Sequence, residues 1–258
     1  MMRRLSRLTA LWLLLLLLFD TAPLRAGTLS IIDQSTWVKV AYVYDGDTFR
    51  AANGDKIRLL GINTPEITHG SEPGEPMGKE AAAALRRIIG GKTVRLEFDQ
   101  QRHDIYGRLL AQVYLHDGTW VNGEMVRFGY AHIYTFTPNL RWAPALLAIE
   151  RPARQQRLGI WHTKRFAVLP ATRVGHAQIG QFRLVRGSVD HTDRSGFGFR
   201  LARLHITVPR KYRSYFDHHP LVHRGEQVVV HGVIRANRSG NKLFLALHSP
   251  DNLEIIRQ

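Results

Sequence analysis

The stretch that decides the fold runs from Val43 to Glu66 and reads V-Y-D-G-D-T-F-R-A-A-N-G-D-K-I-R-L-L-G-I-N-T-P-E. Turns at 45–46 and 53–54 separate strands predicted over 37–44, 48–51 and 57–62, which form an antiparallel meander. Asp45 and Asp47 stand on the first turn, and Arg58 interrupts an apolar strand. Alone, the acids also fit simple turn formers and the arginine a solvent-reaching side chain. Together they indicate a site for a hard cation and a phosphate.

The composition bounds the class of protein. A chain of 258 residues with 44% hydrophobic residues is long enough for one large domain or two small ones. Lys and Arg number 36 against 21 Asp and Glu, a formal charge of +15. Such a balance favours polyanionic partners, either nucleic acid or an anionic membrane surface. The absence of cysteine excludes thiolate metal ligands and a cysteine nucleophile.

The N-terminus has the pattern of an export signal. Arg3, Arg4 and Arg7 precede an unbroken apolar run over 11–19, and small residues follow at 22–26. The run is too short to span a bilayer, so residues 1–26 are predicted to be removed and no membrane span to remain. Removal of four Arg and one Asp would leave a charge of +12. We therefore expect a basic protein that is periplasmic or secreted.

The rest of the first half continues the pattern of strands and helices. Residues 79–89 predict a helix that stops at a Gly-Gly pair, and 142–158 predict another that Pro152 should kink or interrupt. Residues 93–98 and 109–115 predict two further strands. Arg108 follows the turn at 104–107 and offers a second guanidinium for phosphate.

Several separated motifs occur in order at compatible spacings: Gly46-Asp47-Thr48, Arg58 to Glu66, Asp104-Ile105-Tyr106-Gly107-Arg108, Val121-Asn122 and Gly159-Ile160-Trp161. This set resembles the staphylococcal-type thermonuclease family, over about residues 37–161. The resemblance implies a five-stranded OB barrel with three helices. It also implies a calcium-dependent nuclease that cleaves DNA and RNA and leaves 3′-phosphate ends.

The resemblance also assigns roles, residue by residue. Asp47 matches a calcium carboxylate, Asn63 lies at a second ligand position, and Thr64 matches a threonine that ligates through its backbone carbonyl. Arg58 and Arg108 match the arginines that hold the scissile phosphate. The remaining matches are Glu66, which activates or orients the attacking water, Tyr106, which contacts a substrate phosphate, and Tyr134 and Phe136, which lie at the nucleobase.

Three positions depart from the family pattern. Asn63 stands where the reference enzyme has aspartate, which removes one negative charge and should weaken calcium binding, so another divalent ion stays open. Ile105 replaces a lysine that helps bind phosphate. Phe136 replaces a second tyrosine, which keeps stacking but loses the hydroxyl.

The second half predicts another barrel. After a linker over 162–177, five strand patterns with a short helix near 210–216 follow OB-fold order across 178–258. The segment resembles, more loosely, single-strand and anticodon-binding OB domains. Its basic and aromatic residues fit either a nucleic-acid platform or a solvated rim; they are Arg200, Arg203, Arg210, Lys211, Arg213, Tyr212, Tyr215 and Phe216.

The predicted fold class is therefore α+β, mainly β, with two successive OB-type barrels after residues 27–36. The leading hypothesis is an exported, metal-dependent nuclease acting as a monomer on DNA and RNA. The alternatives are a non-catalytic nucleic-acid-binding protein of two OB barrels and an envelope scaffold. Arg58, Glu66 and Arg108 favour the enzyme, because binding alone does not require a carboxylate facing the phosphate.

Overall fold

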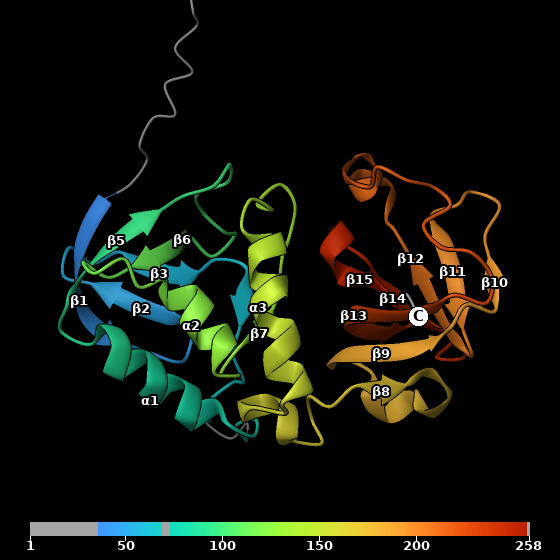
Figure 1. Cartoon of the computed structure of the whole chain (residues 1–258), viewed down its shortest axis with the longest axis horizontal. Coiled ribbons are helices and arrows are strands. Elements are labelled where there is room, and N and C mark those ends of the chain that lie inside the picture. Colours follow the sequence, from blue (N-terminus) through green and yellow to red (C-terminus); the bar gives the residue numbers. More distant parts are fainter. Residues whose placement is uncertain (1–35, 69–72, 257–258) are drawn as a thin grey trace, which may run out of the picture. The chain divides into compact units, whose positions relative to one another are not determined.

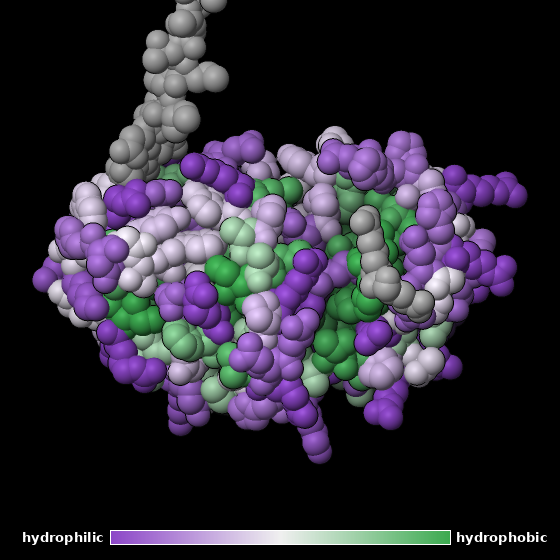
Figure 2. Space-filling view, viewed as in Figure 1, coloured by the Kyte–Doolittle hydropathy of each residue, from purple (hydrophilic) through white to green (hydrophobic). Residues whose placement is uncertain are grey.

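The computed structural model describes residues 36–68 and 73–256. All of them belong to one compact unit, 34–258. The predicted signal at 1–26 lies outside the described residues, as does the lead-in predicted over 27–36 apart from Thr36, where β1 begins. Within the described part, no helix is long and apolar enough to cross a membrane. Hydrophilic residues cover much of the face in Figure 2, with apolar residues between them.

The first half is built on a closed barrel (Figure 1). Its strand order is β1-β2-β3-β6-β5. Alternating apolar residues form these strands, and their inward side chains meet in one core. The bounds are β1 Thr36–Val43, β2 Thr48–Ala51, β3 Lys56–Leu59, β5 Thr93–Glu97 and β6 Leu109–Tyr114. A separate two-stranded pair joins β4 (Ile62–Asn63) to β7 (His132–Ile133).

Register brings the two halves of the sequence motif together. Thr48 pairs with Arg58 across the antiparallel β2 and β3. Arg58 in turn lies opposite Leu110 across the parallel β3 and β6. Asn63 pairs with His132 across β4 and β7. The strand that carries Arg58 is thus central, with the 45–48 turn on one side and the 104–108 turn at the start of its other neighbour.

Three α-helices accompany the barrel, as predicted: α1 Gly78–Ile89, α2 Val121–Arg127 and α3 Ala143–Gln155. In α1 the acidic Glu80 lies in the first turn and basic residues in the last, as the helix dipole favours. Its small Ala81 and Ala84 are buried in the barrel core. Helix α3 continues through Pro152 and ends three residues later. A 3₁₀ helix, η1 (Gly159–His162), follows.

The second half forms a barrel-like sheet in the order β10-β11-β12-β14-β13-β9-β8, with β15 also paired to β13 (Figure 1). The bounds are β8 Leu169–Pro170, β9 Phe182–Ser188, β10 His191–Thr192, β11 Gly198–Leu201, β12 Leu204–Thr207, β13 Gln227–Ala236, β14 Leu243–Ala246 and β15 Leu253–Ile255. Short 3₁₀ helices are η2 Ala171–Arg173, η3 His176–Gln178, η4 Arg210–Tyr215 and η5 Pro250–Asn252.

This second sheet repeats the order of the first. In the first barrel β3 pairs with β6 in parallel, and in the second sheet β12 pairs with β14 in parallel. The short helix predicted near 210–216 is the 3₁₀ helix η4. Residues 162–177, predicted to be a linker, contain the buried Phe166 and the strand β8, which pairs with β9.

Side chains also join the two halves. Arg154 of α3 donates to both carboxylate oxygens of Glu254 in β15, at 2.8 and 2.9 Å. The buried hydroxyls of Thr135 and Ser249 lie 2.9 Å apart. Trp161 packs in an apolar cluster, separate from the core of the first barrel, with Phe182 of β9. The second barrel therefore rests on the α3 side of the first.

Candidate active site at the β1–β2 turn

The Asp-Gly-Asp turn is shaped by close packing. A Cβ on Gly46 would lie 2.7 Å from the Cβ of Ala81 in α1 and 2.7 Å from Cγ2 of Thr64. Such distances are shorter than van der Waals contact, so only glycine fits between the helix and the segment after β4. The Asp47 amide donates to Oδ1 of Asp45 at 3.0 Å. The turn is thereby held so that Asp47 points into the molecule.

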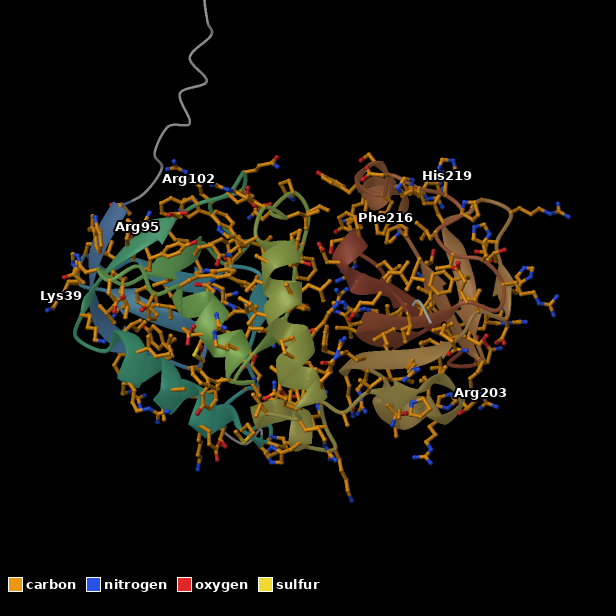
Figure 3. All side chains as sticks on the ribbon, in the orientation of Figure 1. Lys39, Arg95, Arg102, Arg203, Phe216 and His219 are labelled. Atoms are coloured by element: carbon orange, nitrogen blue, oxygen red, sulfur yellow. The ribbon has the colours of Figure 1, made fainter. Side chains whose placement is uncertain are left out.

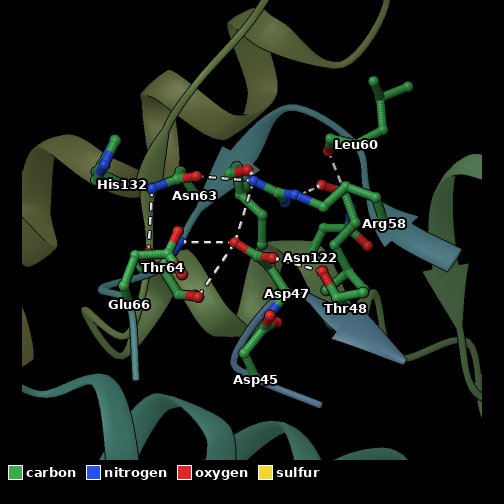
Figure 4. A network of polar contacts seen from close by, with 12 residues as sticks. Asp45, Asp47, Thr48, Arg58, Leu60, Asn63, Thr64, Glu66, Asn122 and His132 are labelled. Carbon is green, nitrogen blue, oxygen red and sulfur yellow. Dashed lines mark hydrogen bonds and ion pairs between the residues drawn. The ribbon is translucent and has the colours of Figure 1, made fainter. Parts of the chain in front are cut away.

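Asp47 is the centre of a buried polar network (Figure 4). Its Oδ1 accepts from the Thr48 hydroxyl at 3.0 Å. Its Oδ2 accepts from the Thr64 amide at 2.9 Å and the Thr64 hydroxyl at 3.1 Å. The same oxygen lies 3.1 Å from Nη2 of Arg58. Burial of a carboxylate is tolerated here because hydrogen bonds and a cation surround it.

Arg58 is anchored at several points. Its Nη1 donates to the carbonyls of Leu59 and Ile62 at 3.0 and 2.9 Å. Its Nη2 donates to Oδ1 of Asn63 at 2.8 Å. Its side chain is only 11% exposed. Since guanidinium stays protonated at any accessible pH, the strand holds a fixed positive charge beside Asp47.

Asp45 is the second carboxylate of the turn. Burial, and after it the neighbouring charge of Asp47, raises the pKa of Asp45 to about 6, although the backbone hydrogen bond from Asp47 and the charge of Arg58 act to lower it. Two carboxylates are thus held close together with one cation nearby. Such an arrangement favours the approach of a further positive charge.

The segment after β4 supplies more oxygen atoms. The Asn63 amide nitrogen donates to the Thr64 carbonyl at 3.1 Å. Glu66 is exposed and lies at the Thr64 end of the network (Figure 4). Its amide donates to a carboxylate oxygen of Glu75 at 3.3 Å, and Glu75 pairs with Arg165. The structure therefore brings Asp47, Arg58, Asn63, Thr64 and Glu66 to one place.

Arg108 and Tyr106 lie on the turn before β6 and are organised by Asp104. Oδ1 of Asp104 accepts from the amides of Tyr106 and Arg108 at 2.9 and 3.0 Å. Oδ2 accepts from Nε of Arg108 at 2.6 Å. Partial burial acts to raise the pKa of Asp104, but the hydrogen bonds from Arg108 and Tyr106 lower it. Across 36–68 and 73–256, no hydrogen bond or ion pair joins Arg108 to Asp47 or Arg58.

Tyr134 and Phe136 follow β7, and their rings meet edge to face with centroids 4.6 Å apart. The Tyr134 amide donates to the carbonyl of Gly61 at 2.9 Å, which fixes this segment to the chain between β3 and β4. Tyr134 is half-buried, and Phe136 is 38% exposed. The Tyr106 ring is 77% exposed and stands apart from them on its own turn. An aromatic surface therefore lies on the β7 side of the network.

The matches with known proteins agree with this geometry. A model of the family "Staphylococcal nuclease homologue" matches residues 56–163. A thermonuclease of Staphylococcus hyicus is 32% identical over 145 residues, which span 55% of this chain and 85% of that protein. The chain belongs to the staphylococcal nuclease homologue family.

Two further relatives of this nuclease homologue extend the comparison. Endonuclease YncB of Bacillus subtilis is 33% identical over 150 residues, 55% of this chain and 71% of that protein. An uncharacterized protein of Bacillus anthracis is 39% identical over 133 residues, and the match spans 62% of that protein. The predicted family and its class, a nuclease, are confirmed. The second barrel lies beyond the family match, so its likeness to single-strand and anticodon modules stays a prediction.

Sequence reasoning did not find the buried polar groups that support the site of this nuclease homologue. The Asn122 amide donates to the Leu60 and Ala111 carbonyls at 3.0 and 3.3 Å, and Gln112 donates to the same Leu60 carbonyl at 2.9 Å. His132 is 1% exposed and stacks on Phe182 at 3.9 Å. The Val121-Asn122 motif was the one sequence signal for these groups. Its Asn122 supports the backbone at the end of β3 and in β6 and does not mark a contact with substrate.

The candidate metal ligands near the 45–48 turn are oxygen atoms. In the part of the chain that the structure describes, no group of three or more His, Cys, Asp or Glu side chains could hold a metal ion. The nearby histidines in the sequence, His218, His219 and His223, do not form such a group either. The oxygen atoms at the ligand positions that the family resemblance assigns belong to Asp47, Asn63 and Thr64. They are one carboxylate, one side-chain amide and one peptide carbonyl. Such a set is typical of hard cations.

Proposed function

We propose that the protein is a divalent-metal-dependent nuclease that hydrolyses phosphodiester bonds of DNA and RNA. The observation that carries the proposal is the buried contact of Asp47 with Arg58 at 3.1 Å, beside the exposed Glu66. It sets a cation, an acid and several oxygen donors at one edge of the barrel. Such a combination can bind a phosphodiester, neutralise its charge and orient a water.

The proposed metal is calcium, held by the Asp47 carboxylate, the Asn63 amide oxygen and the Thr64 carbonyl. These donors fit a hard cation, and Asp45 adds negative charge 3.0 Å from the Asp47 amide. When bound, a divalent ion lowers the repulsion between the phosphodiester and an incoming nucleophile. Because Asn63 is neutral, we expect weak affinity for calcium. An exported protein meets higher calcium concentrations, which suits such a site.

The two arginines have different parts in this proposal. Arg58 is fixed by its Nη groups, so its charge is already in place when the phosphate gains negative charge. Arg108 is held through Nε alone. Among the described residues its Nη groups have no hydrogen-bond partner, and these groups can donate to phosphate oxygens. Asp104 therefore orients the Arg108 side chain and leaves its Nη groups available to a phosphate.

Glu66 is proposed to orient or deprotonate the attacking water. Attack of that water on phosphorus breaks the bond to the 5′-oxygen, which leaves as a hydroxyl once it is protonated. The products are a 3′-phosphate and a 5′-hydroxyl end. Tyr106 would contact a neighbouring phosphate, and Tyr134 and Phe136 a base.

A digestion assay tests the proposal. The mature protein, residues 27–258, is incubated with single-stranded and duplex DNA and with RNA, in calcium or in a chelator, beside Glu66→Gln. We expect digestion in calcium, its loss with the chelator, and a loss of about 10²–10⁴-fold in rate for the variant. Glu80→Gln, an exposed acid in α1, is the matched control. No digestion by the wild type would favour the non-catalytic binding protein.

A further inference from the structure

The basic and aromatic residues grouped in the second half do not form one surface. Figure 3 places Arg203 on the opposite side of the second barrel from Phe216 and His219. Phe216 is buried in the second core, and Arg213 lies over the Phe197 ring at 4.7 Å. The group that fitted either a nucleic-acid platform or a solvated rim is therefore divided. Only part of it, together with Arg235 and His248, adjoins the nuclease site.

A cavity of about 130 Å³ lies where the segment after β7 meets β13 and the end of β14. Tyr134 and Phe136 line it from the first barrel, and Arg235 and His248 from the second. Two side chains proposed to lie at the nucleobase therefore share a surface with two residues of the second barrel.

Three rings that line this cavity and the neighbouring Tyr212 form a continuous aromatic row. Tyr134 meets Phe136 at 4.6 Å, Phe136 stacks on His248 at 5.3 Å, and His248 meets Tyr212 of η4 edge-on at 5.1 Å. Successive aromatic rings of this kind provide stacking positions for successive bases. The row leads from the nuclease network onto the second barrel.

Cations accompany the row. Lys211 lies over the Tyr212 ring at 4.6 Å, and Arg235 is exposed on β13. Neither takes part in a salt bridge with any residue within 36–68 and 73–256. Burial raises the pKa of Tyr134, and the positive charges of Arg58 and Arg235 oppose this rise. The Tyr134 phenol is thus within electrostatic reach of both the nuclease arginine and the second-barrel arginine.

We propose that Arg235 and His248 of the second barrel form an additional subsite for the single-stranded substrate of the nuclease. A base contacts Phe136 and His248, and Arg235 holds the adjoining phosphate. The inference rests on the proposed nuclease function and extends it, because it makes the second barrel part of the substrate-binding surface. It predicts that a longer strand binds better than a dinucleotide.

Binding without turnover tests this subsite. The dissociation constant of the full mature chain is measured in a chelator for a dinucleotide and for a single strand of about twelve nucleotides, a length within OB-fold site sizes. We expect Arg235→Gln combined with His248→Ala to raise the Kd of the longer strand roughly tenfold. The salt slope of its binding should fall by about 0.7, one phosphate contact. The Kd of the dinucleotide should stay unchanged.

Arg238→Gln is the matched control, because Arg238 is exposed in the β13–β14 turn and does not line the cavity. It removes the same charge and should change the Kd of the longer strand less than twofold. Equal effects of the two arginine changes, or no effect of either, would overturn the subsite. Arg235→Gln alone, at an exposed position, separates loss of contact from misfolding.

Activity distinguishes the two proposals. If the wild type digests DNA but the variant binds the longer strand normally, the subsite is wrong and the nuclease stands. If the wild type binds the longer strand through Arg235 and His248 but digests nothing, the subsite stands and the nuclease fails.

Discussion

The two barrels share a strand order but differ in how they hold charge. In the first, the turn before the second strand carries Asp47, whose side chain is 8% exposed beside Arg58 at 11%. In the second, the corresponding turn carries Asp193, which meets His205 at 3.2 Å with side chains 37% and 50% exposed. The fold alone therefore does not require a buried ion pair at this turn.

Burial of an ion pair has a desolvation cost that an exposed pair does not have. A buried carboxylate and guanidinium lose their hydration and are retained only with additional hydrogen bonds. Asp47 has three such bonds from Thr48 and Thr64, and Arg58 has three to carbonyl and amide oxygens. The exposed pair keeps its water and contributes little. The difference indicates that chemistry resides in the first barrel.

Among changes that test the difference between the two barrels, Arg58→Gln should have the largest effect. It removes the fixed charge beside Asp47, so we expect the rate of DNA cleavage to fall about 10²–10³-fold. The free energy of unfolding should fall by about 3–5 kcal/mol, because Asp47 stays buried without its cation. Arg50→Gln, exposed on β2, is the control and should change neither quantity measurably. Normal cleavage by Arg58→Gln would remove the distinction between the barrels.

Each barrel also buries a neutral histidine. Burial lowers the pKa of His132 to about 3 and that of His231 to about 4. Between these values and about 6.5 the unfolded chain binds more protons than the folded one, so stability is lost as pH falls through this window. We expect this loss to be on the order of a few kcal/mol in total.

Thermal unfolding of His132→Phe between pH 3 and 7 checks this assignment. Phenylalanine keeps the ring stacked on Phe182 and removes the titration, so the melting temperature should fall less steeply in acid. His116→Phe, an exposed histidine stacked on Trp37, should leave the acid slope unchanged. Equal slopes for the wild type and His132→Phe would contradict the burial argument.

Asp104→Asn tests whether the orientation of Arg108 matters. The variant keeps an oxygen for the backbone amides but loses the charged partner of Nε. We expect kcat/KM to fall about 10–100-fold, since a small misplacement of a phosphate ligand has effects of this size. Partial recovery in Asp104→Glu would support a positioning role. Glu124→Gln removes the partly buried partner of the exposed Arg127 and should leave kcat/KM unchanged.

Asn63→Asp sharpens the metal proposal. Restoring a second carboxylate should lower the dissociation constant for calcium about tenfold, because affinity rises with ligand charge. Calorimetric titration of residues 27–258 measures it, with Asn53→Asp at the exposed β2–β3 turn as the control. An unchanged dissociation constant for calcium would show that residue 63 does not ligate the cation.

The smallest effect belongs to the second barrel. Asp193→Asn removes the exposed contact with His205 and should change the free energy of unfolding by less than about 1 kcal/mol in denaturant titration. A change in the free energy of unfolding comparable to that of Arg58→Gln would show that this exposed pair stabilises the protein as much as the buried one.

Much of the fold could be predicted from local patterns. Alternation located the strands of both barrels, the alanine-rich run located α1, and the motif from Arg58 to Glu66 located the residues that meet Asp47. These features depend on near neighbours or on a meander with short turns. The group of basic and aromatic residues that includes Arg203 and Phe216 could not be placed from the sequence, because sequence proximity does not say which side of a barrel a residue occupies.

By itself, the sequence determined the strand order, the family and the cluster of Asp47, Arg58, Asn63, Thr64 and Glu66. Only the tertiary structure decided that Asp104 holds Arg108 through Nε, that His132 is buried against Phe182, and that Phe136 stacks on His248. The physical reason is distance along the chain. Phe136 and His248 are brought together by the packing of two barrels, and no local periodicity encodes which surfaces such packing joins.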